Sequence, residues 1–130
     1  MPVPESAIAK YREIAAEAEA AFAGSRELHE SWRAAYDFAR DLVAAAEEGR
    51  SAPGFMEHIP DLRTLDLDDP RAVSVRQKLA DARAEAARRD EHARRARERA
   101  QELARLRDAC AAELRRRGVP EARLHPRIAA

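Results

Sequence analysis

Histidines are the first residues to consider for chemistry, because helical proteins hold di-iron centres with inward-facing Glu-x-x-His pairs. The chain has four of them: His29, His58, His92 and His125. Four residues stand three positions before them, and none is a carboxylate: Arg26, Phe55, Arg89 and Ala122. No two histidines are close in sequence, so the familiar ligand spacing of a zinc or iron site is absent. The sequence predicts neither a metal nor a cofactor.

The single cysteine, Cys110, is the next candidate for a reactive group. It lies on an apolar helical stripe near Leu103, Leu106 and Leu114, where a buried thiol acts as a small hydrophobe. A nucleophilic role needs a thiolate and a neighbouring base, and no histidine flanks this cysteine. With only four glycines, the chain also lacks a phosphate-binding loop. We therefore predict a protein that is not an enzyme and has no evident small-molecule substrate.

Arginine spacing is the sharpest remaining signal. Four arginines recur at intervals of eleven residues, which keeps them on one face of a straight helix, and a fifth lies close to that line: Arg83, Arg94, Arg105, Arg116 and Arg76. Such a ladder could follow a nucleic-acid phosphate backbone. Acidic residues four positions before arginines, including the ladder residue Arg94, compete with this reading, as in Glu85–Arg89, Asp90–Arg94 and Glu91–Arg95. Both alternatives, phosphate contacts and a self-paired helix surface, stay open at this point.

Composition identifies the elements that must position these residues. Ala, Glu, Lys, Leu and Arg supply 80 of the 130 residues, which is typical of long helices or coiled coils. β-Branched and aromatic residues are too scarce for a β-rich fold. The 24 basic and 24 acidic residues cancel, unlike the large net charge usual in disordered chains. The predominance of Arg over Lys suggests a bacterial origin, and the lack of a membrane span or signal peptide suggests a cytoplasmic location.

A first helix is predicted from about residue 5 to 48. Its apolar stripe runs from Tyr11 to Ala46 in alternating steps of three and four residues, which is a heptad seam. A second line at sevens lies beside it: Ala15, Phe22, His29, Tyr36 and Val43. Gly24 falls inside this segment without disturbing the register. We therefore expect a continuous helix, or one kinked at Gly24, with a break there as the alternative.

Residues 49–69 form a predicted linker that is rich in large apolar side chains. Glycines and prolines bracket it, and Phe55, Met56, Ile59 and Leu62 lie within it. We expect it either to fold over the open end of the helices or to serve as a docking site for a partner. A small regulator that presents this linker to a larger enzyme is a further reading.

A second helix is predicted from about residue 70 to 117. Asp69 can cap its start and Pro70 can occupy its first position, while Gly118 and Pro120 end it. Its stripe runs from Val75 through a series of alanines to Leu114. Residues 118–130 are expected to be a tail with little structure of its own.

Antiparallel pairing of the two helices places position n opposite roughly 118 − n. Large residues of the first helix then meet alanines of the second, so that Trp32 faces Ala86. We predict one all-α domain, residues 1–130, built as a long antiparallel, coiled-coil-like helical hairpin. The apolar face of the first helix is wider than one hairpin can bury, so we expect self-association into a four-helix bundle.

The first functional hypothesis is a non-enzymatic assembly or adaptor subunit whose partner is itself, as a homodimer or larger oligomer, and/or another helical protein. Its expected interface consists of aromatic and apolar residues of the first helix and the linker: Phe22, Trp32, Tyr36, Phe38, Val43, Phe55, Met56, Ile59 and Leu62. The alternative is a nucleic-acid-binding accessory subunit, such as a small helical component of a ribonucleoprotein, phage or plasmid machine. In that case the phosphate contacts would come from Arg76, Arg83, Arg94, Arg105 and Arg116.

Overall fold

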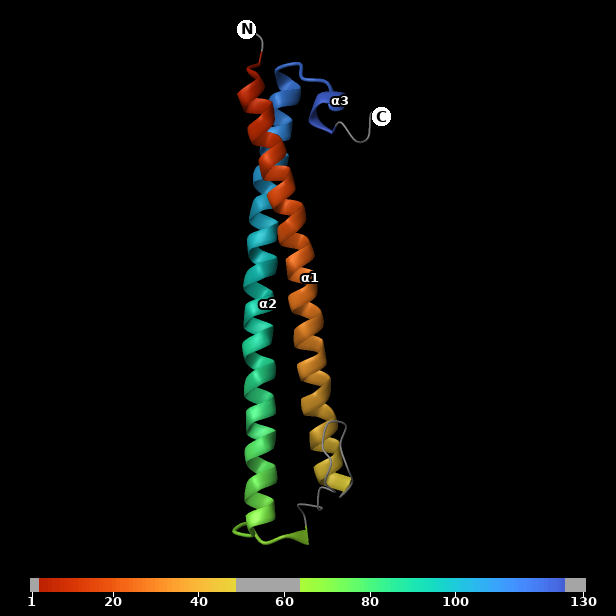
Figure 1. The fold of residues 1–130 in the computed structure, drawn as a ribbon, viewed down its shortest axis with the longest axis vertical. Coiled ribbons are helices and arrows are strands. Elements are labelled where there is room, and N and C mark those ends of the chain that lie inside the picture. Colours follow the sequence, from red (N-terminus) through yellow and green to blue (C-terminus); the bar gives the residue numbers. More distant parts are fainter. Residues whose placement is uncertain (1–2, 49–63, 126–130) are drawn as a thin grey trace. The chain divides into compact units, whose positions relative to one another are not determined.

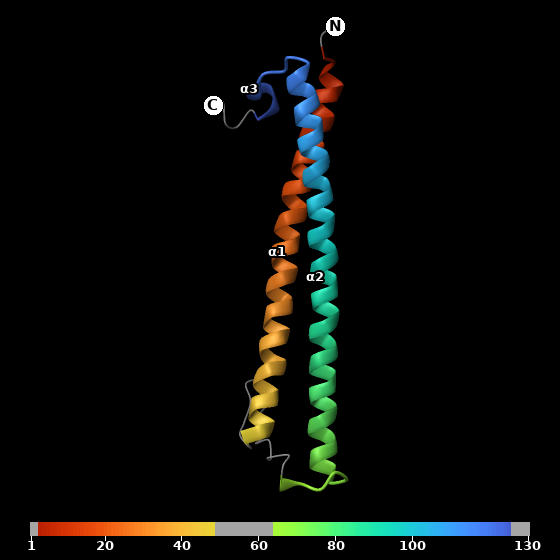
Figure 2. The same cartoon turned by 180° about the vertical axis from the view of Figure 1, so that it is seen from behind.

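The computed structural model describes residues 3–48 and 64–125. Helix α1 spans Glu5–Glu48, α2 spans Pro70–Arg116 and the short α3 spans Glu121–Leu124, with no strand in the described ranges. The protein is therefore an all-α helical hairpin in which α1 and α2 run antiparallel (Figures 1 and 2). α1 passes through Gly24 without interruption, as the unbroken heptad register predicted.

Contacts within the chain divide it into two compact units, and each contains a stretch of both long helices. One unit comprises Glu27–Ala93 and the other comprises Met1–Arg26 together with Arg94–Ala130. We call Glu27–Ala93 the central unit and the other the terminal unit. The prediction of a single domain over residues 1–130 stays a prediction.

The central unit is held together by small apolar residues. Ala39, Leu42, Ala45 and Ala46 of α1 are buried against Val75 and Ala82 of α2. Alanines let the two helices approach closely, and Leu42, only 1% exposed, fills the remaining space. Arg89 Nη1 also donates to the carbonyl oxygen of Ser31 at 3.2 Å, which places these residues opposite each other near the predicted register.

The terminal unit has a core of larger side chains. Ile8 and Tyr11 of α1 are buried with Ala111 and Leu114 of α2, and with two residues that follow α2, Val119 and Leu124. Leu124 belongs to α3 and is 2% exposed. The segment expected to be a tail with little structure of its own therefore contributes two side chains to this core. The reason is the turn after α2, which brings the apolar Val119 and Leu124 back against α1.

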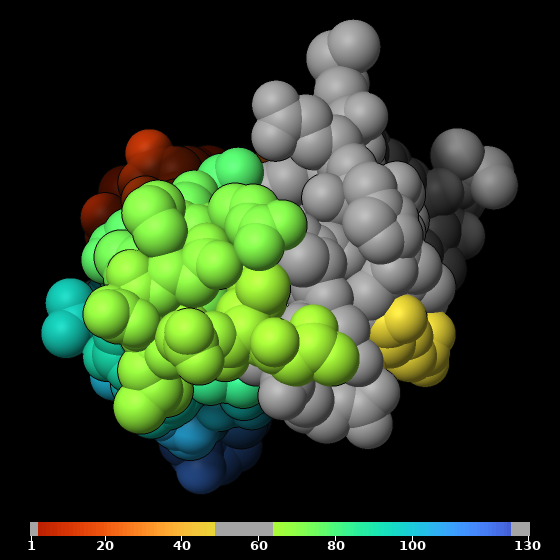
Figure 3. All heavy atoms as spheres, turned by 90° about the horizontal axis from the view of Figure 1, so that it is seen from below, coloured from red at the N-terminus to blue at the C-terminus, as the bar shows by residue number. Residues whose placement is uncertain are grey.

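Both ends of α2 follow from local chemistry. Asp69 Oδ1 accepts a hydrogen bond from the backbone N–H of Arg71 at 2.9 Å, which is an N-cap. Residues 64–69 and the first turns of α2 lie at this end of the central unit (Figure 3). At the other end, Gly118 has φ +87°, and Val119 N–H and Gly118 N–H donate to the carbonyls of Leu114 and Arg115. This is a Schellman motif, which requires the left-handed conformation that glycine adopts readily.

The predicted stripes coincide with the buried faces of the helices. Every residue of the stripe from Tyr11 to Ala46 on α1, and of that from Val75 to Leu114 on α2, is buried or half-buried. In the line beside the α1 stripe, by contrast, His29 and Tyr36 are exposed. The apolar face of α1 is thus wider than the face that α2 covers, and the predicted four-helix bundle stays a prediction.

Candidate functional site

Three aromatic rings form a row along α1 in the central unit. The rings of His29 and Trp32 lie 5.2 Å apart at 51°, and those of Trp32 and Tyr36 lie 5.7 Å apart at 40°. Their spacing of three and four residues places them on neighbouring turns of one helix face. Tyr36 is 47% exposed and Trp32 is half-buried. The row therefore presents aromatic surface to solvent instead of closing the core.

A groove of about 500 Å³ lies beside this row, between α1 and α2. We call it the aromatic groove. Its apolar lining is Trp32, Tyr36, Ala39 and Val43 from α1, with Ala86 and Ala87 from α2. The alanines of α2 leave the space because they do not reach the large rings opposite. Its charged lining consists of Arg40, Arg83 and Asp90. An apolar groove with a few charged groups at its edges is suited to binding.

Phe38 lies on the other flank of the helix pair. It lines a smaller groove of about 300 Å³ with Ala34, Ala35, Ala82, Glu85 and Arg89. Two residues along a helix correspond to a rotation of about 200°, so Phe38 and Tyr36 point in nearly opposite directions. The structure therefore brings Trp32, Tyr36 and Val43 together and separates Phe38 from them.

The other predicted interface residues do not join the aromatic groove. Phe22 is half-buried and belongs to the terminal unit. The linker residues lie outside the described part of the chain: Phe55, Met56, Ile59 and Leu62.

The arginine ladder is split between the two units, and several members have partners. Arg76 Nη1 donates to the carbonyl oxygen of Leu67 at 2.9 Å, and Arg116 pairs with Glu113. Arg94 is also engaged, Arg105 is exposed, and Arg83 lines the aromatic groove. The ladder therefore includes arginines with an interaction partner and arginines that are exposed. Arg83 is the ladder residue that lines the same groove as Trp32 and Tyr36.

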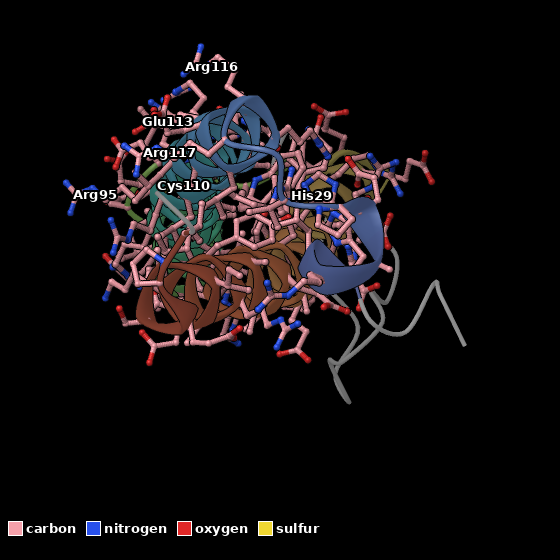
Figure 4. The ribbon with its side chains drawn as sticks, turned by 90° about the horizontal axis from the view of Figure 1, so that it is seen from above. His29, Arg95, Cys110, Glu113, Arg116 and Arg117 are labelled. Atoms are coloured by element: carbon pink, nitrogen blue, oxygen red, sulfur yellow. The ribbon has the colours of Figure 1, made fainter. Side chains whose placement is uncertain are left out.

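Two glutamates of α2 pair with arginines in a recurring Glu-x-x-Arg-Arg pattern. Glu113 pairs with Arg116 and Arg117, and these three side chains lie together at the end of α2 (Figure 4). Glu85 pairs in the same way with Arg88 and Arg89, the latter at 2.8 Å. Hydrogen bonds from these arginines lower the pKa of both glutamates. Pairing with arginine thus favours the charged form of both carboxylates.

The histidines and the cysteine are dispersed. His29 stacks on Trp32, His92 is exposed on α2, and His125 contacts Tyr11 in the terminal unit. Cys110 is half-buried and packs against the terminal core. Within residues 3–48 and 64–125, no three His, Cys, Asp or Glu side chains are grouped so as to hold a metal ion. His58 lies outside these ranges.

A cluster in the terminal unit was not anticipated from the sequence. Tyr11, His125, Glu121 and Arg115 come from all three helical segments, and Nε2 of His125 lies 3.2 Å from the Tyr11 hydroxyl and 3.9 Å from Glu121 Oε2. The only signal was the pair of apolar residues Val119 and Leu124 beyond the helix-ending glycine. The cluster anchors the end of the chain to α1, and we assign it a structural role.

Comparison of the chain with protein-family models, curated proteins and solved structures gave no match. In the described ranges no helix carries an apolar stretch long enough to cross a membrane.

Proposed function

We propose that the protein is a non-enzymatic helical assembly or adaptor subunit that acts through protein–protein contacts. Its partner is a second copy of the chain, another helical protein, or both, and its place of action is the cytoplasm. The observation that carries the proposal is the aromatic groove, in which the half-buried Trp32 and the exposed Tyr36 stand beside a floor of alanines.

Aromatic side chains in such a position are efficient binding groups. Trp and Tyr dominate the energetics of many protein interfaces, because each buries a large area at a small cost in conformational entropy. A helix laid along the groove would cover Trp32, Tyr36 and Val43 together, since all three line it. A second hairpin could supply such a helix and complete a four-helix bundle.

The experiment is light scattering coupled to size-exclusion chromatography, applied to the wild-type chain and to a Trp32→Ala, Tyr36→Ala double variant. We expect the wild type to elute as a dimer, a larger oligomer or a complex with a helical partner, and the double variant to elute as a free monomer. Circular dichroism checks that the variant keeps its helices. Leu106→Ala is a matched control, because Leu106 is a large apolar residue, 50% exposed, that lies in the other unit.

Loss of assembly in the control as well as in the double variant would contradict a specific role for the aromatic groove. So would assembly that persists unchanged in the double variant.

A nucleic-acid-binding accessory subunit is the second candidate, and one observation favours it. Arg83 lies in the same groove as Trp32 and Tyr36, so a guanidinium group and stacking rings are combined at one place. This candidate predicts co-purifying nucleic acid that salt removes, and a smaller salt dependence in an Arg83→Gln, Arg94→Gln, Arg105→Gln variant. Binding unaffected by these three changes would exclude the arginine ladder.

A further inference from the structure

The charged side chains that line the aromatic groove have a net positive charge, because two arginines stand against one aspartate. Arg40 lines the groove from α1 and Arg83 lines it from α2. Arg33 and Arg76 lie seven residues from them, which is about two helical turns along the same edges. The apolar floor of the groove is therefore bordered by arginines on both sides.

Carboxylates near the groove offset this charge only in part. Asp37 Oδ1 lies 3.7 Å from Arg33 Nε and 3.5 Å from Arg40 Nη1, and Asp41 lies 3.6 Å from Arg40 Nη2. All four residues are on α1, so this network belongs to one edge. On the α2 edge the lining includes Asp90 beside Arg83. The side chains of Arg33 and Arg40 remain about 60% exposed despite these contacts.

A second copy of the same groove is a poor occupant for electrostatic reasons. Two-fold pairing of identical grooves brings together two linings that each have a net positive charge. Juxtaposed like charges oppose association and select against the wrong partner. The occupant expected from charge complementarity has an apolar centre and acidic edges.

We propose that the aromatic groove binds an amphipathic acidic helix of a partner protein. This inference rests on the proposed function and narrows the partner at the same site. The apolar side of the helix lies against Trp32, Tyr36 and Val43, and carboxylates at its two edges face Arg40 and Arg83. The groove extends along α1 from residue 32 to 43, which matches about three turns of a bound helix.

The apolar floor favours a helix over nucleic acid at this site. Ala39, Val43, Ala86 and Ala87 offer no hydrogen bonds from their side chains to a sugar or base. An apolar helix face is complementary to the same surface.

Trp32 is the chain's only tryptophan, so its fluorescence reports on the groove directly. The probe is a peptide of about 18 residues, long enough for measurable helicity, with a leucine stripe flanked by glutamates and no aromatic residue. The matched control peptide has lysine in place of every glutamate. We expect the glutamate peptide to shift Trp32 emission saturably, with an affinity that falls as salt is added.

Charge variants locate the effect at the groove edges. Arg83→Glu should weaken the glutamate peptide roughly fivefold or more and improve binding of the lysine peptide, as expected for an exposed pair that is reversed in sign. Arg105→Glu is the control, because Arg105 is an exposed arginine of α2 in the other unit. It should leave the affinity unchanged. Arg83→Gln, which introduces no new charge, provides an intermediate value.

Several outcomes overturn the inference. Equal binding of both peptides would show apolar attraction without charge selection, and no binding of either would leave the groove without a helical ligand. Saturation of the same signal by a single-stranded oligonucleotide in place of the peptide would assign the groove to nucleic acid. A concentration-dependent Trp32 shift in the chain alone would assign it to a second copy.

Failure of this inference is distinguishable from failure of the proposed function. If neither peptide binds but the wild type assembles and the Trp32→Ala, Tyr36→Ala variant does not, the assembly role stands and only the acidic partner is wrong. If the peptides do not bind and no assembly depends on Trp32 and Tyr36, both proposals fail.

Discussion

The hydroxyl of Tyr11 lies 3.2 Å from Nε2 of His125, so the start of α1 and the segment after α2 are joined by a side-chain hydrogen bond. Their rings also meet edge to face, with centroids 5.8 Å apart at 78°. Nearby, Arg12 Nε donates to the carbonyl oxygen of Arg123 at 3.1 Å, and Arg123 pairs with Glu5. Polar contacts as well as the buried Leu124 thus hold α3 against α1.

Tyr11→Phe tests the contribution of this hydrogen bond to stability. Removal of one buried hydroxyl while the ring remains should lower the free energy of unfolding by about 1 kcal/mol. Urea denaturation measures the change. His125→Ala and the double variant complete a cycle, and the two effects should be less than additive because both remove the same contact. Strict additivity would show that the two side chains do not stabilise each other.

The same tyrosine should make stability fall at alkaline pH. Burial raises the pKa of Tyr11 above its ordinary value of about 10, since the side chain is only 2% exposed. Because the folded-state pKa is the higher one, the stabilisation is fully present below the unfolded-state pKa. It is lost as pH rises from that value through the folded-state pKa. Denaturation midpoints measured across this window should decline more in the wild type than in Tyr11→Phe.

The long helices could be predicted because their periodicity extends over at least five heptads and their ends carry strong local signals. Asp69-Pro70 and Gly118 act through backbone chemistry that depends on a few neighbouring residues. Continuity through Gly24 followed from the register on either side of it. Such features need no knowledge of distant contacts.

The grooves and the docking of α3 could not be predicted in the same way. A seven-residue line groups Tyr36 with Phe22 and Val43, but it does not show which of these residues α2 covers. The separation of Phe38 from Tyr36, by contrast, follows from their spacing of two residues along one helix. The meeting of Arg83 with Trp32 depends on the register between two helices. Docking of Val119 and Leu124 depends on the turn at Gly118 directing the chain back toward α1.

Asp69 should stabilise the start of α2 in a pH-dependent way. Hydrogen bonds from the side chain and backbone N–H of Arg71 lower the pKa of Asp69 below its ordinary value of 3.8. The folded-state pKa is therefore the lower one, and the stabilisation is present above the unfolded-state pKa and is lost as pH falls through the folded-state value. Asp69→Ala should lower the thermal midpoint at neutral pH, whereas Asp69→Asn should retain part of the cap. Wild type and Asp69→Ala should converge in acid, and a constant difference between them would argue against the charged cap.

The two described glycines should respond in opposite ways to substitution by alanine. An added Cβ meets nothing within 4 Å at either Gly24 or Gly118, so space does not distinguish them. Gly24 lies inside α1, where alanine is favoured over glycine by about 1 kcal/mol, and Gly24→Ala should stabilise the chain by that amount.

At Gly118 the φ of +87° reverses the sign of the effect. An alanine there is strained in the left-handed conformation, so Gly118→Ala should lower the free energy of unfolding of the chain by about 1–2 kcal/mol. Urea denaturation of the wild type and of both variants measures the two changes in the free energy of unfolding. Stabilisation by Gly118→Ala would show that the turn relaxes without strain, and destabilisation by Gly24→Ala would show that α1 is not helical at that position.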